Sequence, residues 1–196
     1  PDSGATAKVT GWRMCADNMP SGTSYKLGDV LMARSGTTVE VKNTDAEGRI
    51  VMMDAIALAV EEGVDAIIDI ATLTGAALMA LGQLTAPVLG NDQRVVDLTL
   101  AASAVTGEPL WQLPLERKYR PQLDSDVADL ANIGGRYAGA TTAALFLDHF
   151  TRKTPWAHLD IAGTMAVDAD ESWRSKGATG FGARLLLETA LTFTKA

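Results

Sequence analysis

Short apolar runs alternate along the chain with longer segments in which apolar residues recur every three or four positions. The short runs, several of them rich in Val and Ile, predict strands, and the longer segments predict amphipathic helices. The predicted strands cover residues 7–12, 28–33, 37–41, 65–71, 86–90 and 156–163. The predicted helices cover residues 50–60, 72–82, 93–106, 138–150 and 180–193.

Helices that alternate with buried-looking strands indicate one fold class. Runs such as 67–71 are apolar with little alternation, which is typical of parallel strands covered on both faces. The sequence therefore predicts an α/β fold with a largely parallel mixed sheet and helices on both faces. Residues 108–135 are interrupted by proline and charged residues, and we expect an irregular surface segment there. A chain of 196 residues with 47% hydrophobic residues fits one domain, 1–196.

The net charge and the cysteine content exclude several classes of function. With 17 Lys+Arg against 24 Asp+Glu, the net charge of −7 argues against a nucleic-acid partner. No apolar run is long enough for a membrane span. The single cysteine, Cys15, cannot form an internal disulfide, so we expect a reducing, cytoplasmic compartment. Cys15 is predicted to be a small buried hydrophobe, His158 a hydrogen-bonded structural histidine, and His149 a solvated one. Without a Cys/His framework, a metal ion would have to be bound mainly by carboxylates.

One polar motif precedes the predicted helix at 50–60. The sequence "NTDAEGR" places Asp45, Glu47 and Arg49 where a loop enters that helix. The positive end of the helix dipole would favour the ionised carboxylates, which could hold a divalent cation, while Arg49 could hold an anion. Gly48 would let the backbone approach a ligand closely. On spacing alone, a capped and solvated helix start with Arg49 paired to one of the acids explains the same residues.

The motif and four other segments, in the same order, resemble the leucyl aminopeptidase family of dinuclear metallo-exopeptidases. The other segments are "DNMPSG" with the following "GDV", then "ATLTGA", "HLDIAGT" and "KGATGFGARLL". The resemblance covers nearly the whole chain and corresponds to the C-terminal portion of that family's catalytic domain. It implies an enzyme that removes N-terminal, preferably leucine-like residues from peptides by means of a metal-bridging water.

The resemblance also implies roles for single residues. Asp45 would ligate one metal, Glu47 would bridge two, and Arg49 would hold a bicarbonate that acts as general base. The metals would be Zn or Mn, with Mg or Co as alternatives. The pocket for the substrate's first side chain would be lined by Thr72, Gly75, Ala162 and Met165, and the backbone of Leu73 would hydrogen-bond to the substrate. Without the family, Thr72–Gly75 is equally a strand end with a helix cap, and Met165 a core or surface filler.

Some features depart from the family pattern. Asp17 stands where the family usually has Glu, and Leu27 where it has Pro. The family's N-terminal domain, its remaining metal ligands and a second catalytic lysine would precede residue 1, so we expect an upstream segment of the same protein as a partner and no activity from this chain alone. A homo-hexamer is the expected assembly. The alternative is a truncated, non-catalytic homologue that serves as a structural or DNA-interaction module.

Overall fold

A four-stranded mixed sheet forms the centre of the molecule. The computed structural model describes residues 7–15, 19–172 and 174–194. The sheet order is β3 (Ile67–Ala71), β7 (Trp156–Asp160), β4 (Ala86–Gly90) and β5 (Leu110–Gln112). The β3–β7 and β4–β5 pairs are parallel and the β7–β4 pair is antiparallel. The predicted α/β class with a largely parallel mixed sheet is confirmed.

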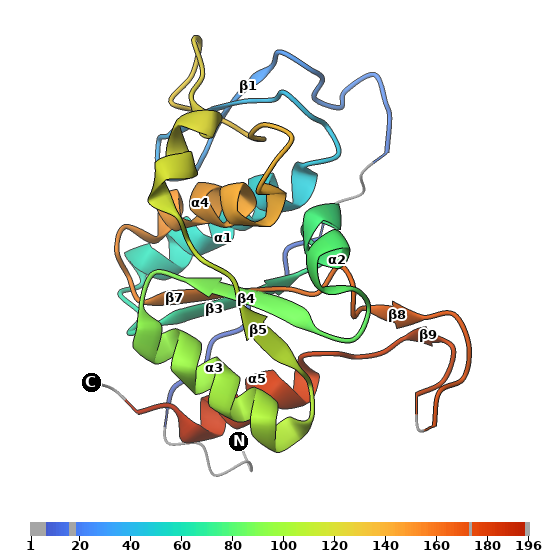
Figure 1. The fold of residues 1–196 in the computed structure, drawn as a ribbon. Coiled ribbons are helices and arrows are strands. Elements are labelled where there is room, and N and C mark those ends of the chain that lie inside the picture. Colours follow the sequence, from blue (N-terminus) through green and yellow to red (C-terminus); the bar gives the residue numbers. More distant parts are fainter. Residues whose placement is uncertain (1–6, 16–18, 173, 195–196) are drawn as a thin grey trace.

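Helices cover both faces of this sheet, as predicted (Figure 1). Helices α1 (Glu47–Glu61) and α4 (Gly139–Thr151) lie on one face, and α3 (Gln93–Thr106) and α5 (Ala183–Thr192) lie on the other. Helix α3 begins and ends where the sequence predicts, because the Asp92 side chain caps its first turn and Gly107 takes a left-handed conformation at its end. No helix in the described ranges is long and apolar enough to cross a membrane.

The strand side chains alternate between two separate hydrophobic cores. On β7, Trp156 packs into the core beneath α1 and α4, whereas Ala157 and Leu159 pack into the core beneath α3 and α5. His158 and Asp160 lie on the same face as Trp156, because successive side chains of a strand point to opposite sides. The strand thus carries two polar, fully buried residues toward α1.

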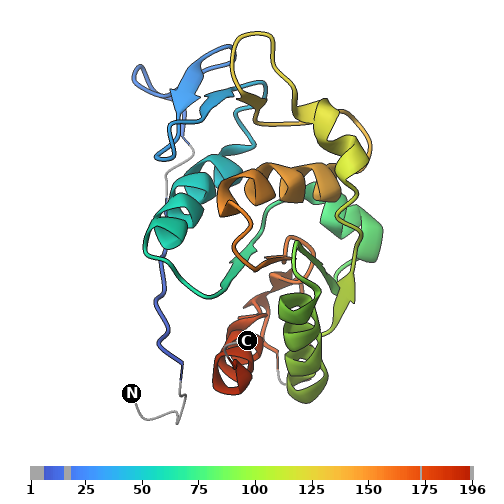
Figure 2. The same cartoon turned by 90° about the vertical axis from the view of Figure 1, so that its left-hand side faces the viewer.

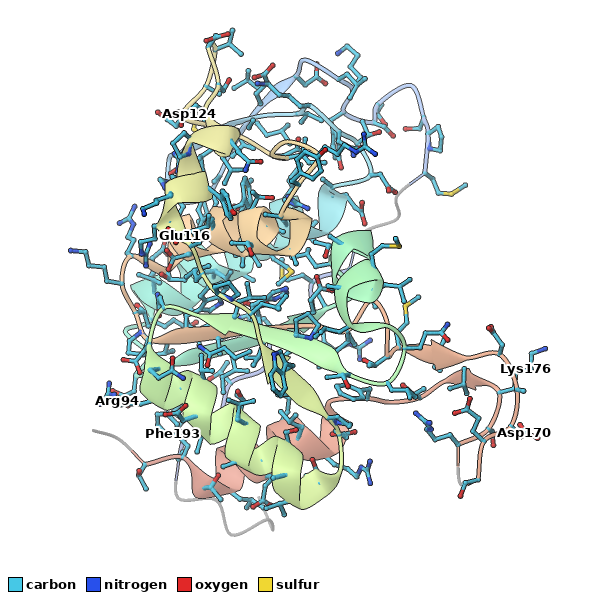
Figure 3. All side chains as sticks on the ribbon, viewed as in Figure 1. Arg94, Glu116, Asp124, Asp170, Lys176 and Phe193 are labelled. Atoms are coloured by element: carbon cyan, nitrogen blue, oxygen red, sulfur yellow. The ribbon has the colours of Figure 1, made fainter. Side chains whose placement is uncertain are left out.

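A small second sheet lies beyond α1 and α4 (Figure 2). It contains β1 (Val30–Met32), β2 (Thr38–Glu40) and β6 (Leu130–Ala131), with β2 antiparallel to β1 and parallel to β6. The 3-10 helix η1 (Arg117–Leu123) precedes β6. A hairpin of β8 (Ala166–Val167) and β9 (Gly177–Ala178) projects sideways near the level of the central sheet, with Asp170 and Lys176 toward its tip (Figure 3).

Several sequence predictions need correction. Residues 7–12 form no strand, and only Trp12 among the larger side chains there packs against the core. The segment 108–135 is less irregular than expected, because it contains β5, η1 and β6. Cys15 is exposed, so it is not a buried hydrophobe. Of the two positions that depart from the family pattern, Leu27 lies exposed in a turn and Asp17 falls outside the described residues.

Helix boundaries near the predicted site also differ from the sequence pattern. Helix α1 begins at Glu47, three residues before the first apolar position. Helix α2 (Gly75–Leu81) begins three residues later than predicted, because Thr74 is extended and its side chain accepts a hydrogen bond from the Ala77 amide as an N-cap. Strand β7 ends at Asp160, since the chain then turns and the amides of Thr164 and Met165 donate to the Ile161 carbonyl.

Candidate active site

The loop that carries Asp45 is fixed from a distant part of the chain. Asn132, which is completely buried, accepts hydrogen bonds from the amides of Lys42 and Asn43 and donates to the Asn43 carbonyl at 2.6 Å. The Asn43 side chain then accepts a hydrogen bond from the Asp45 amide at 2.9 Å. These contacts hold the backbone of the loop, while the side chain of Asp45 remains exposed.

Glu47 and Arg49 lie in the first turn of α1 and are partly or wholly buried. The Glu47 Oε2 atom is buried without a hydrogen-bond partner, and so are the Nε and Nη1 atoms of Arg49. Orphaned buried groups of this kind are rare, and they call for an explanation such as a bound ion. Glu47 Oε2 is an acceptor suited to a cation, and the two Arg49 nitrogens are donors suited to an anion.

The charge of Arg49 is maintained by two acidic neighbours. Burial lowers the pKa of the Arg49 guanidinium to about 10, and the negative charges of Asp160 and Glu47 oppose that shift. The group is therefore positively charged at neutral pH. Tyr25 lies close to Glu47. Burial raises the pKa of the Tyr25 phenol, and the negative charge of Glu47 raises it further. Its hydroxyl donates to the Thr44 carbonyl at 3.3 Å.

The loop after β3 meets the start of α1. A Cβ atom added to Gly48 would lie 3.4 Å from the Leu73 side chain, so the two segments are in contact. Asp160, at the end of β7, accepts hydrogen bonds from the amides of Leu73 and Thr74 and from the Thr74 hydroxyl. The same carboxylate accepts a hydrogen bond from the Ala162 amide at 3.2 Å.

The predicted site residues are thus brought together only in part. The backbones of Leu73 and Ala162 converge on Asp160, whose charge acts on Arg49. Thr72, Gly75 and Met165 are exposed at the ends of the same two loops. The side chain of Asp45 is exposed, whereas the Glu47 Oε2 atom is buried.

A second polar group lies beneath this site. His158 is buried and its Nδ1 atom hydrogen-bonds to Asp69, which also accepts from the Trp156 indole. Burial disfavours the charged imidazole, but the neighbouring carboxylates of Asp69 and Asp160 together outweigh it and raise the pKa of His158. The prediction of a hydrogen-bonded structural histidine is confirmed, and His149 is exposed as predicted. The His158 Nε2 atom has no hydrogen-bond partner and lies 4.0 Å from the Asp160 carboxylate.

The residues fit a metal ion as part of a ligand set. Glu47 and Asp45 supply carboxylate oxygens, which are the donors that hard divalent ions prefer. Within the described ranges, no group of three or more His, Cys, Asp or Glu side chains is arranged to hold a metal. The chain can therefore contribute ligands to a metal site, and these two carboxylates do not complete one.

The sequence reading missed Asp160, Asp69 and Asn132. Asp69 lies inside the otherwise apolar run "IIDIA", and Asp160 ends the run "WAHLD", in which His158 is the other polar residue. A carboxylate in a buried strand needs hydrogen-bond partners, which is the signal that could have identified both. Asn132 follows β6, a two-residue strand whose pairing with β2 lies far away in sequence.

Comparison with known proteins gives a consistent result. Residues 2–187 match the family model described as "Cytosol aminopeptidase family, catalytic domain". Proteins named "Probable cytosol aminopeptidase" are similar: 47% identical over 179 residues in Alkaliphilus metalliredigens, 49% over 175 in Synechococcus sp. and 48% over 194 in Geobacter sulfurreducens. These alignments cover 91%, 89% and 94% of the chain. The chain spans only 36%, 34% and 39% of the relatives' own lengths.

Proposed function

Because the chain belongs to the cytosol aminopeptidase family, we propose that the complete protein is a metal-dependent aminopeptidase. It would release N-terminal residues, preferably apolar, leucine-like ones, from peptides in the cytoplasm. The observation that carries this proposal is the set of orphaned buried atoms in the first turn of α1, namely Glu47 Oε2 with Nε and Nη1 of Arg49. A solvated helix cap would not bury these groups without partners.

Asp45 and Glu47 are the proposed metal ligands. Two divalent ions, Zn or Mn with Mg or Co as alternatives, would polarise the scissile carbonyl and lower the pKa of a bound water. Glu47 would direct its orphaned oxygen to the metal from a helix N-terminus, where the helix dipole favours a carboxylate. We propose that the remaining ligands come from a part of the protein outside these 196 residues, so this chain alone would be inactive.

Arg49 is the proposed anion-binding residue. Its buried, unpartnered Nε and Nη1 donors would hold a bicarbonate, which would take up the proton from the attacking water. The side chain is only 5% exposed, so a bound anion would be held in a partly desolvated place where hydrogen bonds are strong.

The two loops joined through Asp160 are the proposed substrate pocket. Thr72, Leu73 and Gly75 would line one side, and Ala162 and Met165 the other. Met165 is 47% exposed, and an exposed thioether at the mouth of a pocket suits an apolar side chain. We also propose that the complete protein is a homo-oligomer, a hexamer, which light scattering after gel filtration would test.

The test of the proposed function uses the complete protein loaded with Mn or Zn and a leucine amide substrate. Glu47→Gln keeps the shape of the side chain but removes its charge, and we expect kcat/KM to fall roughly 100-fold with loss of bound metal. Glu61→Gln is the matched control, because Glu61 lies in the same helix and pairs with Arg34 at the surface. An inactive wild-type enzyme, or equal activity of both variants, would favour the non-catalytic alternative.

A further inference from the structure

We propose that Asp160 is a positioning residue that fixes both walls of the substrate pocket, an inference that rests on the proposed function. Asp160 is not a metal ligand in this proposal and does not touch the reacting atoms. It acts through the Leu73–Thr74 backbone on one side and the Ala162 backbone on the other. Its substitution should therefore alter substrate recognition more than metal binding.

One carboxylate oxygen of Asp160 accepts hydrogen bonds from the backbone amides of both loops, the one after β3 and the one after β7. The Oδ1 atom of Asp160 accepts from the amides of Leu73 at 3.1 Å, Thr74 at 3.3 Å and Ala162 at 3.2 Å. Leu73 and Ala162 are far apart in sequence, but their strands pair in register, with Ala71 opposite Asp160. A single anionic oxygen thus sets the distance between the two loops where they leave the sheet.

The other oxygen orients the start of α2. The Thr74 hydroxyl donates to Asp160 Oδ2 at 2.7 Å and accepts from the Ala77 amide at 3.0 Å. Because the hydroxyl has one proton, its donation to Asp160 leaves the oxygen lone pairs aimed at the helix amide. The chain of bonds from Asp160 through Thr74 to Ala77 therefore fixes the first turn of α2, which includes Gly75.

A carboxylate performs this role better than an amide. Asp160 is 1% exposed, and a buried group with four donors directed at it requires acceptors on both oxygens. In Asp160→Asn, the NH2 group would face the Thr74 hydroxyl and force its proton away from the side chain. The change preserves volume, but it leaves the Thr74 hydroxyl proton without its acceptor and adds a second donor that competes with the Ala77 amide for the same oxygen, so the link to α2 is weakened.

Two groups make up the charged surroundings of Asp160, one on α1 and one on the same strand, β7. Arg49 of α1 interacts with its negative charge, and His158 of β7 lies 4.0 Å away. The His158 ring is held by Asp69 and stacks on Trp156 with centroids 6.3 Å apart. These groups surround a site that is pre-organised before any substrate binds.

The experiment uses the complete Mn-loaded enzyme and compares leucine amide with alanine amide. For Asp160→Asn we expect KM for leucine amide to rise at least tenfold, the preference for leucine over alanine to shrink, and bound Mn per subunit to stay unchanged. Amide hydrogen exchange at residues 72–77 should become faster. Unchanged KM and unchanged preference, with exchange at residues 72–77 as in the wild type, would overturn the proposal.

A second pair of variants makes the test independent of the fate of Asp160→Asn. Thr74→Ser keeps the hydroxyl that bonds to Asp160, whereas Thr74→Val removes it at similar volume. We expect Thr74→Ser to retain wild-type KM within twofold and Thr74→Val to show a raised KM and faster exchange at residues 72–77. Equal behaviour of the two variants would refute the role of this hydrogen bond. If the wild-type enzyme is inactive, the proposed function fails, and hydrogen exchange alone reports whether Asp160 orders the loop.

Discussion

Replacing Gly163 with alanine would place a methyl group where the backbone of another segment already lies. The new Cβ atom would be 2.1 Å from the carbonyl oxygen of Gly82, at the end of α2, and 3.4 Å from the Leu78 side chain. The first contact is with backbone, which cannot rotate away as a flexible side chain can. Gly163 follows Ala162 in the turn after β7, so the clash would press that turn against α2.

The cost follows from this geometry. The turn and the end of α2 would have to separate by roughly 1 Å, and overpacking of this kind costs about 1–3 kcal/mol. With a urea m-value of about 2 kcal/mol/M, a loss of 2 kcal/mol lowers the unfolding midpoint by about 1 M. Gly22→Ala is the control, since its Cβ would meet nothing within 4 Å.

Equilibrium urea unfolding followed by tryptophan fluorescence measures both variants. We expect Gly163→Ala to unfold at a clearly lower urea concentration and Gly22→Ala to match the wild type. If Gly163→Ala were as stable as the wild type, the close approach of the turn to α2 would be wrong, and with it the placement of Ala162 beside the proposed pocket.

Three further predictions concern other positions. Gly75→Ala should leave stability unchanged, because its Cβ would meet nothing within 4 Å, yet its methyl group should lower kcat/KM for leucine amide roughly tenfold in a steady-state assay. Asp92→Ala should lower the free energy of unfolding by about 1 kcal/mol at pH 7, because Asp92 caps α3. Hydrogen bonding to Arg94 lowers the pKa of Asp92, so the stabilisation by its charge is present above the unfolded-state pKa and is lost as pH falls through the lower folded-state pKa. Urea titrations of the wild type and the variant at pH 7 and pH 3 should therefore show a smaller stability difference at pH 3. Asn132→Ala should cost about 1–3 kcal/mol by leaving partly buried backbone groups of Lys42 and Asn43 unpaired, and hydrogen exchange at residue 43 should accelerate.

The elements that sequence predicts well are those determined by local chemistry. Helix α3 has an acidic N-cap at Asp92 and a left-handed glycine at 107, so both of its ends are encoded nearby. Strand β4 is a buried apolar run between turns, which is enough to identify it. The fold class follows from the order of such elements, which is why the α/β prediction is confirmed.

What sequence does not predict depends on contacts with remote segments. Residues 7–12 have the alternation of a strand but pair with no strand among the residues that the structure describes. Strand β6 has only two residues and exists through its pairing with β2. The motif at Asp45–Arg49 can be recognised from the residues alone. The buried carboxylate of Asp160 beside it cannot, because its partners Leu73 and Thr74 are nearly ninety residues earlier and adjoin it only after β3 and β7 pair.

The sheet keeps its two hydrophobic cores apart, and this separation bears on how the protein can evolve. All the residues proposed for metal and anion binding lie on the side of α1, whereas α3 and α5 pack on the other side of the strands. Substitutions in α3 and α5 can therefore adjust heat tolerance while the geometry around Arg49 persists. Divergence among relatives adapted to different temperatures is expected to concentrate in that far layer, and thermostabilising mutations are best sought there first.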